Sequence, residues 1–195
     1  MRRSSTAAAL AATLLYCLPS MPLAGQAQSV EREISDAVSP LPPGLQAGAA
    51  VRAYRDGTLT EIRAGTNGMI CLADDPARKG FHTACYYQSL EPFMARGRDL
   101  RAGGMRAEAA DSVRLAELES GALAVPPPGA SLYSISHDDG AFDPSGGTPA
   151  GMRRLYVVSL PYATEASTGI SATPARDRPW LMYPGKATAH VMISR

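Results

Sequence analysis

Short apolar or alternating segments, separated by turn-forming residues, predict strands along much of the chain. A continuous apolar run such as the segment at 155–160 is typical of a strand in the middle of a sheet. Asp56-Gly57 separates the first two predicted strands and favours a type I′ hairpin turn. The predicted strands cover residues 49–55, 58–64, 69–73, 81–87, 131–137, 155–160, 180–182 and 189–193.

Two helices are predicted in the middle of the chain. The first has Ser89 as its N-cap, and Gly103-Gly104 ends it. Its polar residues, which predict a solvated face, are Glu91, Arg96, Arg98 and Arg101. The second helix covers about residues 105–120. Because the helices are grouped between runs of strands, we expect an α+β fold: a single domain with a mainly antiparallel sheet and two central helices on one side.

The N-terminal 27 residues have the pattern of a secretory signal peptide. Met1-Arg2-Arg3 supplies positive charge, an apolar run follows, and small residues before Ala27 favour cleavage there. A retained membrane anchor is the alternative, but the apolar run is shorter than the roughly 20 residues that span a bilayer. We therefore expect an exported protein, periplasmic or extracellular, with no transmembrane segment after cleavage. Residues 28–45 are predicted to be an extended arm, and residues 46–195 the domain.

Composition narrows the class of protein. The 195 residues suit one globular domain, with 45% hydrophobic and 19% charged residues. A net charge of +1 lacks the basic excess of nucleic-acid-binding proteins, so we expect no nucleic-acid partner. The long segments 138–151 and 164–178 are predicted loops, and loops are where binding residues concentrate.

Cys71 and Cys85 are the cysteines that remain after removal of a signal peptide containing Cys17. An even pair in an exported protein predicts a disulfide. A thiolate metal site is the alternative, but the spacing between the two cysteines matches no common zinc motif.

Candidate chemistry rests on three histidines, because the sequence holds no nucleophile elbow, phosphate-binding loop, dinucleotide fingerprint or zinc-protease motif. His137-Asp138-Asp139 at a strand end offers ligands for a divalent metal, or is simply the solvated start of a loop. His190 shares a strand face with Met192, which suits copper or ordinary core packing. His82 lies three residues before Cys85, which would allow a catalytic Cys–His pair if Cys85 were a free thiol. Residues three apart on a strand point to opposite faces, so this geometry is unfavourable for such a pair.

A few short motifs resemble an uncharacterised group of exported bacterial proteins. Gly65-Thr66-Asn67-Gly68 is followed by Cys71, Asp74-Asp75-Pro76 and Cys85, and a second match covers Pro179 to Met192 with its Ala-His-x-Met segment. The resemblance implies no activity. It does imply that Cys71, Cys85 and His190 belong together in the common structure of this group.

Two main hypotheses follow from these residues, beside a third possibility, a purely structural envelope protein, which an exposed apolar patch without a pocket would indicate. The first is an exported, disulfide-linked domain that binds a small molecule or a partner, with His190, His137, Asp138 and His82 as candidate ligand-binding residues. The second is an enzyme, a metal-assisted hydrolase or oxidase that uses the same histidines with Asp138 or Asp139. Convergence of two histidines and a carboxylate would favour the enzyme, and scattered histidines would favour the binding domain.

Overall fold

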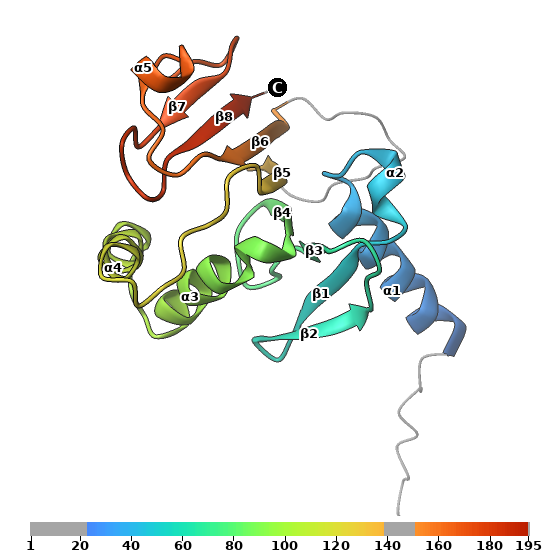
Figure 1. Ribbon diagram of the computed structural model, residues 1–195. Helices are drawn as coiled ribbons and strands as arrows, with labels where there is room; N and C mark the ends of the chain where they lie inside the picture. Colours follow the sequence, from blue (N-terminus) through green and yellow to red (C-terminus); the bar gives the residue numbers. More distant parts are fainter. Residues whose placement is uncertain (1–22, 139–150, 195) are drawn as a thin grey trace, which may run out of the picture.

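The computed structural model describes residues 23–138 and 151–194, with side chains from residue 29 onward. One eight-stranded sheet dominates the fold, with strand order β2-β1-β3-β4-β5-β6-β8-β7 (Figure 1). Neighbouring strands are antiparallel except for β1 and β3. The strands are β1 (Ala50–Arg55), β2 (Thr58–Arg63), β3 (Met69–Leu72), β4 (Phe81–Tyr87), β5 (Ser131–His137), β6 (Arg153–Ser159), β7 (Trp180–Met182) and β8 (His190–Ser194).

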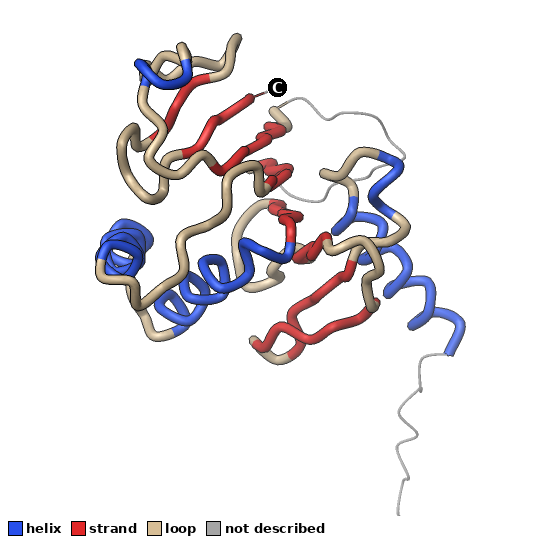
Figure 2. Tube along the Cα trace, viewed as in Figure 1, coloured by secondary structure: helices blue, strands red, loops and turns tan. Residues whose placement is uncertain are grey.

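The longer helices lie at the start and in the middle of the described chain, and Figure 2 distinguishes the helices, in blue, from the strands, in red. The two central helices, α3 and α4, are consecutive and pack against each other. The α+β fold and the mainly antiparallel sheet predicted from the sequence are therefore confirmed. The helical segments are α1 (Leu23–Val38), α2 (Pro43–Gln46), the 3-10 turn η1 (Gln88–Leu90), α3 (Glu91–Ala102), α4 (Ala107–Glu119) and α5 (Glu165–Thr168).

The prediction of an extended arm at residues 28–45 is wrong, because this segment is largely the helix α1. Ile34, Ala37 and Val38 recur at helical spacing and pack on the sheet with Leu41. Ala37, Val38 and Leu41 are buried. The domain core thus begins well before residue 46. The predicted signal peptide lies mostly outside the described residues.

Helices α1 and α3 cover opposite faces of the sheet at strands β3 and β4. Successive residues of a strand point to opposite faces. Accordingly Cys71 and Cys85 pack in a cluster with α1, whereas Ile70 and Tyr86 pack with Leu90 and Met94. This part of the sheet is closed on both sides.

Two local predictions need correction. Ser89 does not cap α3, because the chain makes the turn η1 first and Leu90 occupies the cap position without a side-chain hydrogen bond. The predicted loop at 164–178 contains the short helix α5, which Thr164 and Ser167 cap reciprocally. The hairpin at Asp56-Gly57 is confirmed in type, since both residues have the positive φ angles, 49° and 78°, that a type I′ turn requires.

The motif Gly65-Thr66-Asn67-Gly68 forms a structural turn. The Asn67 side-chain amide donates to the Leu45 carbonyl, and its oxygen accepts from the Met69 backbone N–H. The Gly68 carbonyl accepts from the backbone N–H of Gln88. Gly68 has a φ of 77°, and a Cβ there would lie 2.7 Å from the Tyr87 ring. The turn therefore ties the start of β3 to the end of β4.

Candidate ligand-binding groove

A groove of about 660 Å³ lies between the α3–α4 pair and one face of the sheet. Ligand sites typically have volumes of about 300–1,000 Å³ and mostly apolar walls. The groove has this character, because more than half of its lining residues are apolar and many of these are partly exposed. Its apolar lining includes Phe93, Met94, Leu115, Leu132, Leu155, Val157, Met182 and Met192.

Strand register explains the floor of the groove. Ser134 is paired with Leu155, Leu132 with Val157, and Val157 with Met192, so these side chains project from the same face. The continuous apolar run of β6 therefore divides between two surfaces. Leu155 and Val157 form part of the groove floor, while Tyr156 and Val158 point away from it.

The opposite wall is held by contacts between α3 and α4. Arg96 makes a bidentate ion pair with Glu117. Its Nη2 atom lies 2.5 Å from Oε1 of Glu117, and its Nε atom lies 2.9 Å from Oε2. The Arg114 guanidinium lies 4.0 Å from the centre of the Phe93 ring. Gly97 allows this close approach, since a Cβ there would lie 2.7 Å from an Arg114 nitrogen. These contacts fix α4 to α3.

Helix α4 has α3 as its principal packing partner, and it makes no comparably extensive contact with a strand in the described chain. Figure 1 shows α4 beside α3 and apart from the β6–β8 strands. A helix that packs on the edge of another helix does not seal the sheet face beyond it. The groove is therefore the uncovered part of that face.

His190 lies at the start of β8 and lines the groove. Its Nδ1 atom is 2.7 Å from the backbone carbonyl oxygen of Thr188. A carbonyl only accepts hydrogen bonds, so Nδ1 carries the proton. Burial lowers the pKa of the imidazole, although the Thr188 contact opposes the shift. The ring is thus neutral near neutral pH, and Nε2 carries a lone pair.

Ser159 stands directly across from His190 on the neighbouring strand β6, and both residues line the groove. Directly opposed residues of antiparallel strands have Cβ atoms about 5 Å apart. Ser159 is 7% exposed and Ser134 is 9% exposed, yet neither hydroxyl has a hydrogen-bond partner within the described chain. Sequence reasoning missed both serines. The available signal was strand alternation along residues 155–160, because it predicts that the Ser159 side chain lies on the same sheet face as Val157.

His82 also lines the groove, but the structure does not bring it to His190. His82 is paired with Ser136, whose other neighbour is Arg153 at the start of β6. His190 is paired with Ser159 at the end of β6. At about 3.3 Å per residue the two imidazoles are separated by about 20 Å along the strand direction. They therefore belong to opposite ends of the groove.

The ring of His82 lies at the groove surface and remains solvent-exposed. The surrounding protein still removes part of its solvation, which lowers the pKa, and the nearby Arg78 lowers it further. The neighbouring carboxylate of Asp74 accepts a hydrogen bond from the His82 backbone N–H at 2.8 Å. His82 is therefore a second neutral polar group in the apolar groove.

His137 and Asp138 lie away from the groove. His137 is paired with Phe81, which places it on the other face of the sheet from His82. Asp138 makes a bidentate ion pair with Arg153 at 2.8 and 2.9 Å, and this contact lowers the pKa of the carboxyl group. Asp139 lies outside the described residues.

Metal-ligating side chains do not converge in the part of the chain that the structure describes. Within residues 23–138 and 151–194, no group of three or more His, Cys, Asp or Glu residues is arranged to hold a metal ion. The three described histidines are therefore scattered.

The predicted disulfide between Cys71 and Cys85 is present. The two residues are directly paired across β3 and β4, and both are fully buried. Because Cys85 is oxidised, it cannot act as a nucleophile with His82. The disulfide belongs to the closed part of the sheet and contributes no group to the groove.

The predicted solvated face of the first helix is wrong for Glu91 and Arg98. Glu91 accepts hydrogen bonds from Tyr86 at 2.5 Å, Arg52 at 2.6 Å and Arg98 at 2.8 Å. Burial alone would raise the pKa of Glu91, but these bonds lower it overall. Burial raises the pKa of the Tyr86 hydroxyl. This network ties α3 to the sheet, and no pattern in the sequence showed which strand residues would face the helix.

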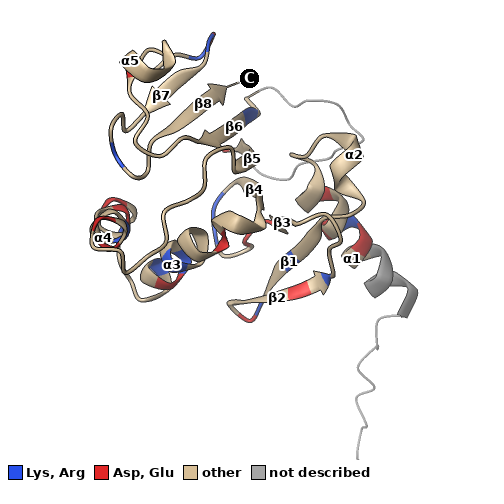
Figure 3. Ribbon diagram, in the orientation of Figure 1, with Lys and Arg blue, Asp and Glu red and all other residues tan. Residues whose placement is uncertain are grey.

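Charged side chains are confined to the walls and mouth of the groove. Glu108 lies on the α4 wall, and the exposed Lys186 lies on the opposite side, in the loop between β7 and β8. Figure 3 shows charges of both signs along α3 and α4 and few on the β7–β8 strands. Lys186 and Glu108 carry opposite charges, so the mouth has no strong preference for either sign.

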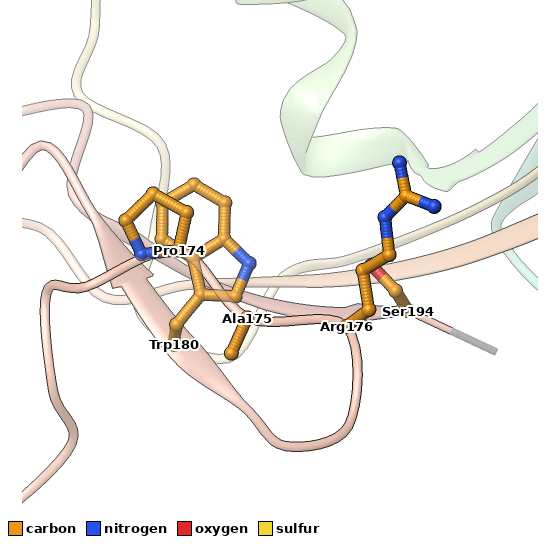
Figure 4. A pocket seen from close by; sticks show the side chains of 5 residues that line it. All are labelled: Pro174, Ala175, Arg176, Trp180 and Ser194. Atoms are coloured by element: carbon orange, nitrogen blue, oxygen red, sulfur yellow. The ribbon is translucent and has the colours of Figure 1, made fainter.

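A second hollow of about 310 Å³ lies near the C-terminal strand. Figure 4 shows the Pro174 ring beside the Trp180 indole, with the Arg176 side chain extending away from both. Its other lining residues are Ala175 and Ser194. It is smaller than the groove, and most of its lining is a surface loop.

None of the described helices has the length and apolar character needed to cross a bilayer. Comparisons of the chain with protein-family models, with curated proteins and with solved structures found no match. The functional argument therefore rests on the groove itself.

Proposed function

We propose that this protein is an exported domain that binds an apolar small molecule in the groove between α3–α4 and the sheet. The groove carries the proposal, because about 660 Å³ of mostly apolar space stays open beside a well-packed sheet. Apolar side chains left in contact with water favour a ligand that covers them. Export rests on the N-terminal sequence pattern and agrees with a buried disulfide.

Binding is favoured over metal-assisted catalysis by the placement of the histidines. His82 and His190 lie at opposite ends of the groove, and His137 lies on the other face of the sheet. In the described chain neither groove histidine belongs to a group of three or more side chains that could hold a metal ion. Neutral imidazoles within apolar walls are suited to hydrogen-bonding a ligand.

The test uses the full sequence expressed in an exporting host and the neutral fluorescent probe N-phenyl-1-naphthylamine. We expect saturable probe binding that Val157→Trp abolishes or weakens at least tenfold, because the indole would fill the groove floor. Val158→Trp is the matched control, since it enlarges the adjacent residue of β6 on the opposite face. Thermal unfolding of both variants verifies that they fold.

Two results would contradict the proposal. One is a folded protein that shows no saturable probe binding, and the other is equal loss of binding in both variants. The intact mass of the purified protein tests export, because cleavage near Ala27 removes a defined segment. An uncleaved chain retained in the cytoplasm would overturn export and leave the groove proposal to the binding assay.

A further inference from the structure

The groove floor is mostly apolar. Ser134 is one polar residue of this floor, and at one end of the groove Ser159 and His190 form a small polar notch. The two residues face each other across β6 and β8, and both project into the groove. On the same sheet face Val157 and Met192 are the next groove residues along β6 and β8, and Met182 of β7 is paired with His190 on its other side. A polar pair flanked by apolar side chains in this way is suited to recognising one polar group on an otherwise apolar ligand.

The hydrogen-bonding capacity of the notch is specific. His190 donates from Nδ1 to the Thr188 carbonyl, which leaves Nε2 as an acceptor. The Ser159 hydroxyl is in a residue more than nine-tenths buried, and it has no partner in the described chain. The notch therefore offers one acceptor, and one hydroxyl that donates or accepts.

We propose that the Ser159–His190 notch binds the hydroxyl group of an apolar alcohol or phenol, and this inference rests on the proposed function. A ligand hydroxyl donates to Nε2 of His190 while its oxygen accepts from Ser159, so both protein groups are satisfied. An ether oxygen has no proton for Nε2. A carboxylate would place its charge against the Nε2 lone pair.

The charge of the ligand group is a second argument for a hydroxyl rather than a carboxylate. Within the described chain no Lys or Arg side chain hydrogen-bonds to Ser159 or His190, and burying a charge without a partner is strongly unfavourable. Lys186 is exposed, and Glu108 lies on the opposite wall, so the mouth does not favour an anion overall. A neutral polar group is the chemistry that the buried part of the groove fits.

The experiment measures displacement of N-phenyl-1-naphthylamine by two isomers, decan-1-ol and 1-methoxynonane, and by decanoate at neutral pH. We expect the alcohol to bind about fivefold to tenfold more tightly than the ether, as one net hydrogen bond provides. His190→Phe should remove this preference without weakening ether binding. His190→Gln, whose side-chain carbonyl supplies an acceptor, should restore part of it.

His82→Phe is the matched control, because His82 lines the other end of the same groove. It should leave the preference for alcohol over ether intact. Ser159→Ala should reduce alcohol binding, and it should affect the ether less than the alcohol.

The outcomes separate this inference from the proposed function. Equal affinity for alcohol and ether, or tightest binding of decanoate, would overturn the notch assignment while probe binding still supports the groove. Failure of the probe itself to bind would overturn both. Hydrolysis of p-nitrophenyl decanoate that is lost in both Ser159→Ala and His190→Phe would assign the pair to catalysis and overturn recognition as its role.

Discussion

The two halves of the sheet differ in how completely they are covered. In the closed half, strands β1–β4, α1 packs on one face, η1 and α3 pack on the other face at β3 and β4, and the Cys71–Cys85 disulfide joins these two neighbouring strands. In the open half, strands β5–β8, one face is the floor of the groove. The same sheet is therefore a packed core at one end and a binding surface at the other.

This difference shows how a small domain keeps apolar surface exposed without losing its fold. Most of the buried apolar residues of the described chain belong to the closed half and the helices that cover it, and burial of apolar area favours folding. The open half is held by its strand pairing with β4 and by the packing of Leu181 and Val191, which are buried. Substitutions in the two halves should consequently have different effects on stability and on binding.

The largest effect is expected from a charge introduced into the closed half. Val38→Asp places a carboxylate at a buried position of α1, and it should lower the free energy of unfolding by about 3 kcal/mol or more. Met192→Asp places the same group at a partly exposed position of the groove floor and should lower the free energy of unfolding by about 1 kcal/mol or less. Urea denaturation of both variants measures the difference. Equal destabilisation would contradict the division into two halves.

Removal of the disulfide should have the next largest effect. Cys71→Ala combined with Cys85→Ala releases a loop of about 15 residues and should lower the free energy of unfolding by about 3 kcal/mol. The folded fraction should still bind N-phenyl-1-naphthylamine with unchanged affinity, because neither cysteine lines the groove. Weaker binding by the folded double variant would show that the closed half shapes the groove directly.

The smallest effect is a pH dependence that arises within the groove. Partial burial lowers the pKa of His82 and His190, so the unfolded chain, with a histidine pKa of about 6.5, takes up protons first as the pH falls. The free energy of unfolding should therefore decrease below about pH 6.5 and level off once the folded imidazoles are protonated. His190→Gln should make this decrease shallower in urea denaturation between pH 7.5 and about pH 5.5. An unchanged slope would show that His190 is not the group responsible.

Most of the strands could be predicted from the sequence, because alternation and turn residues are local signals. Asp56-Gly57 specified its turn through the positive φ angles that Gly and Asp tolerate. The pairing of Cys71 with Cys85 followed from the number of cysteines outside the predicted signal peptide. Helix α1 was missed because residues 28–45 were interpreted from their polarity, although Val30, Ile34, Ala37, Val38 and Leu41 have helical spacing.

The candidate site was less predictable than the fold. His190 and His82 were chosen as single residues, and the structure places both on one groove but at opposite ends. Asp138 was chosen for its position after His137, whereas its partner is Arg153. Ser159 was not chosen, since its role depends on which strand lies beside β6.

The sequence by itself determined the strands, the two central helices and the cysteine pair, because each depends on spacing along the chain. Tertiary structure alone decided that α4 packs on α3 and leaves the sheet face uncovered. It also brought Ser159 opposite His190, although 31 residues separate them in sequence. Strand order and register set these contacts, and both result from the packing of the whole sheet rather than from any local pattern.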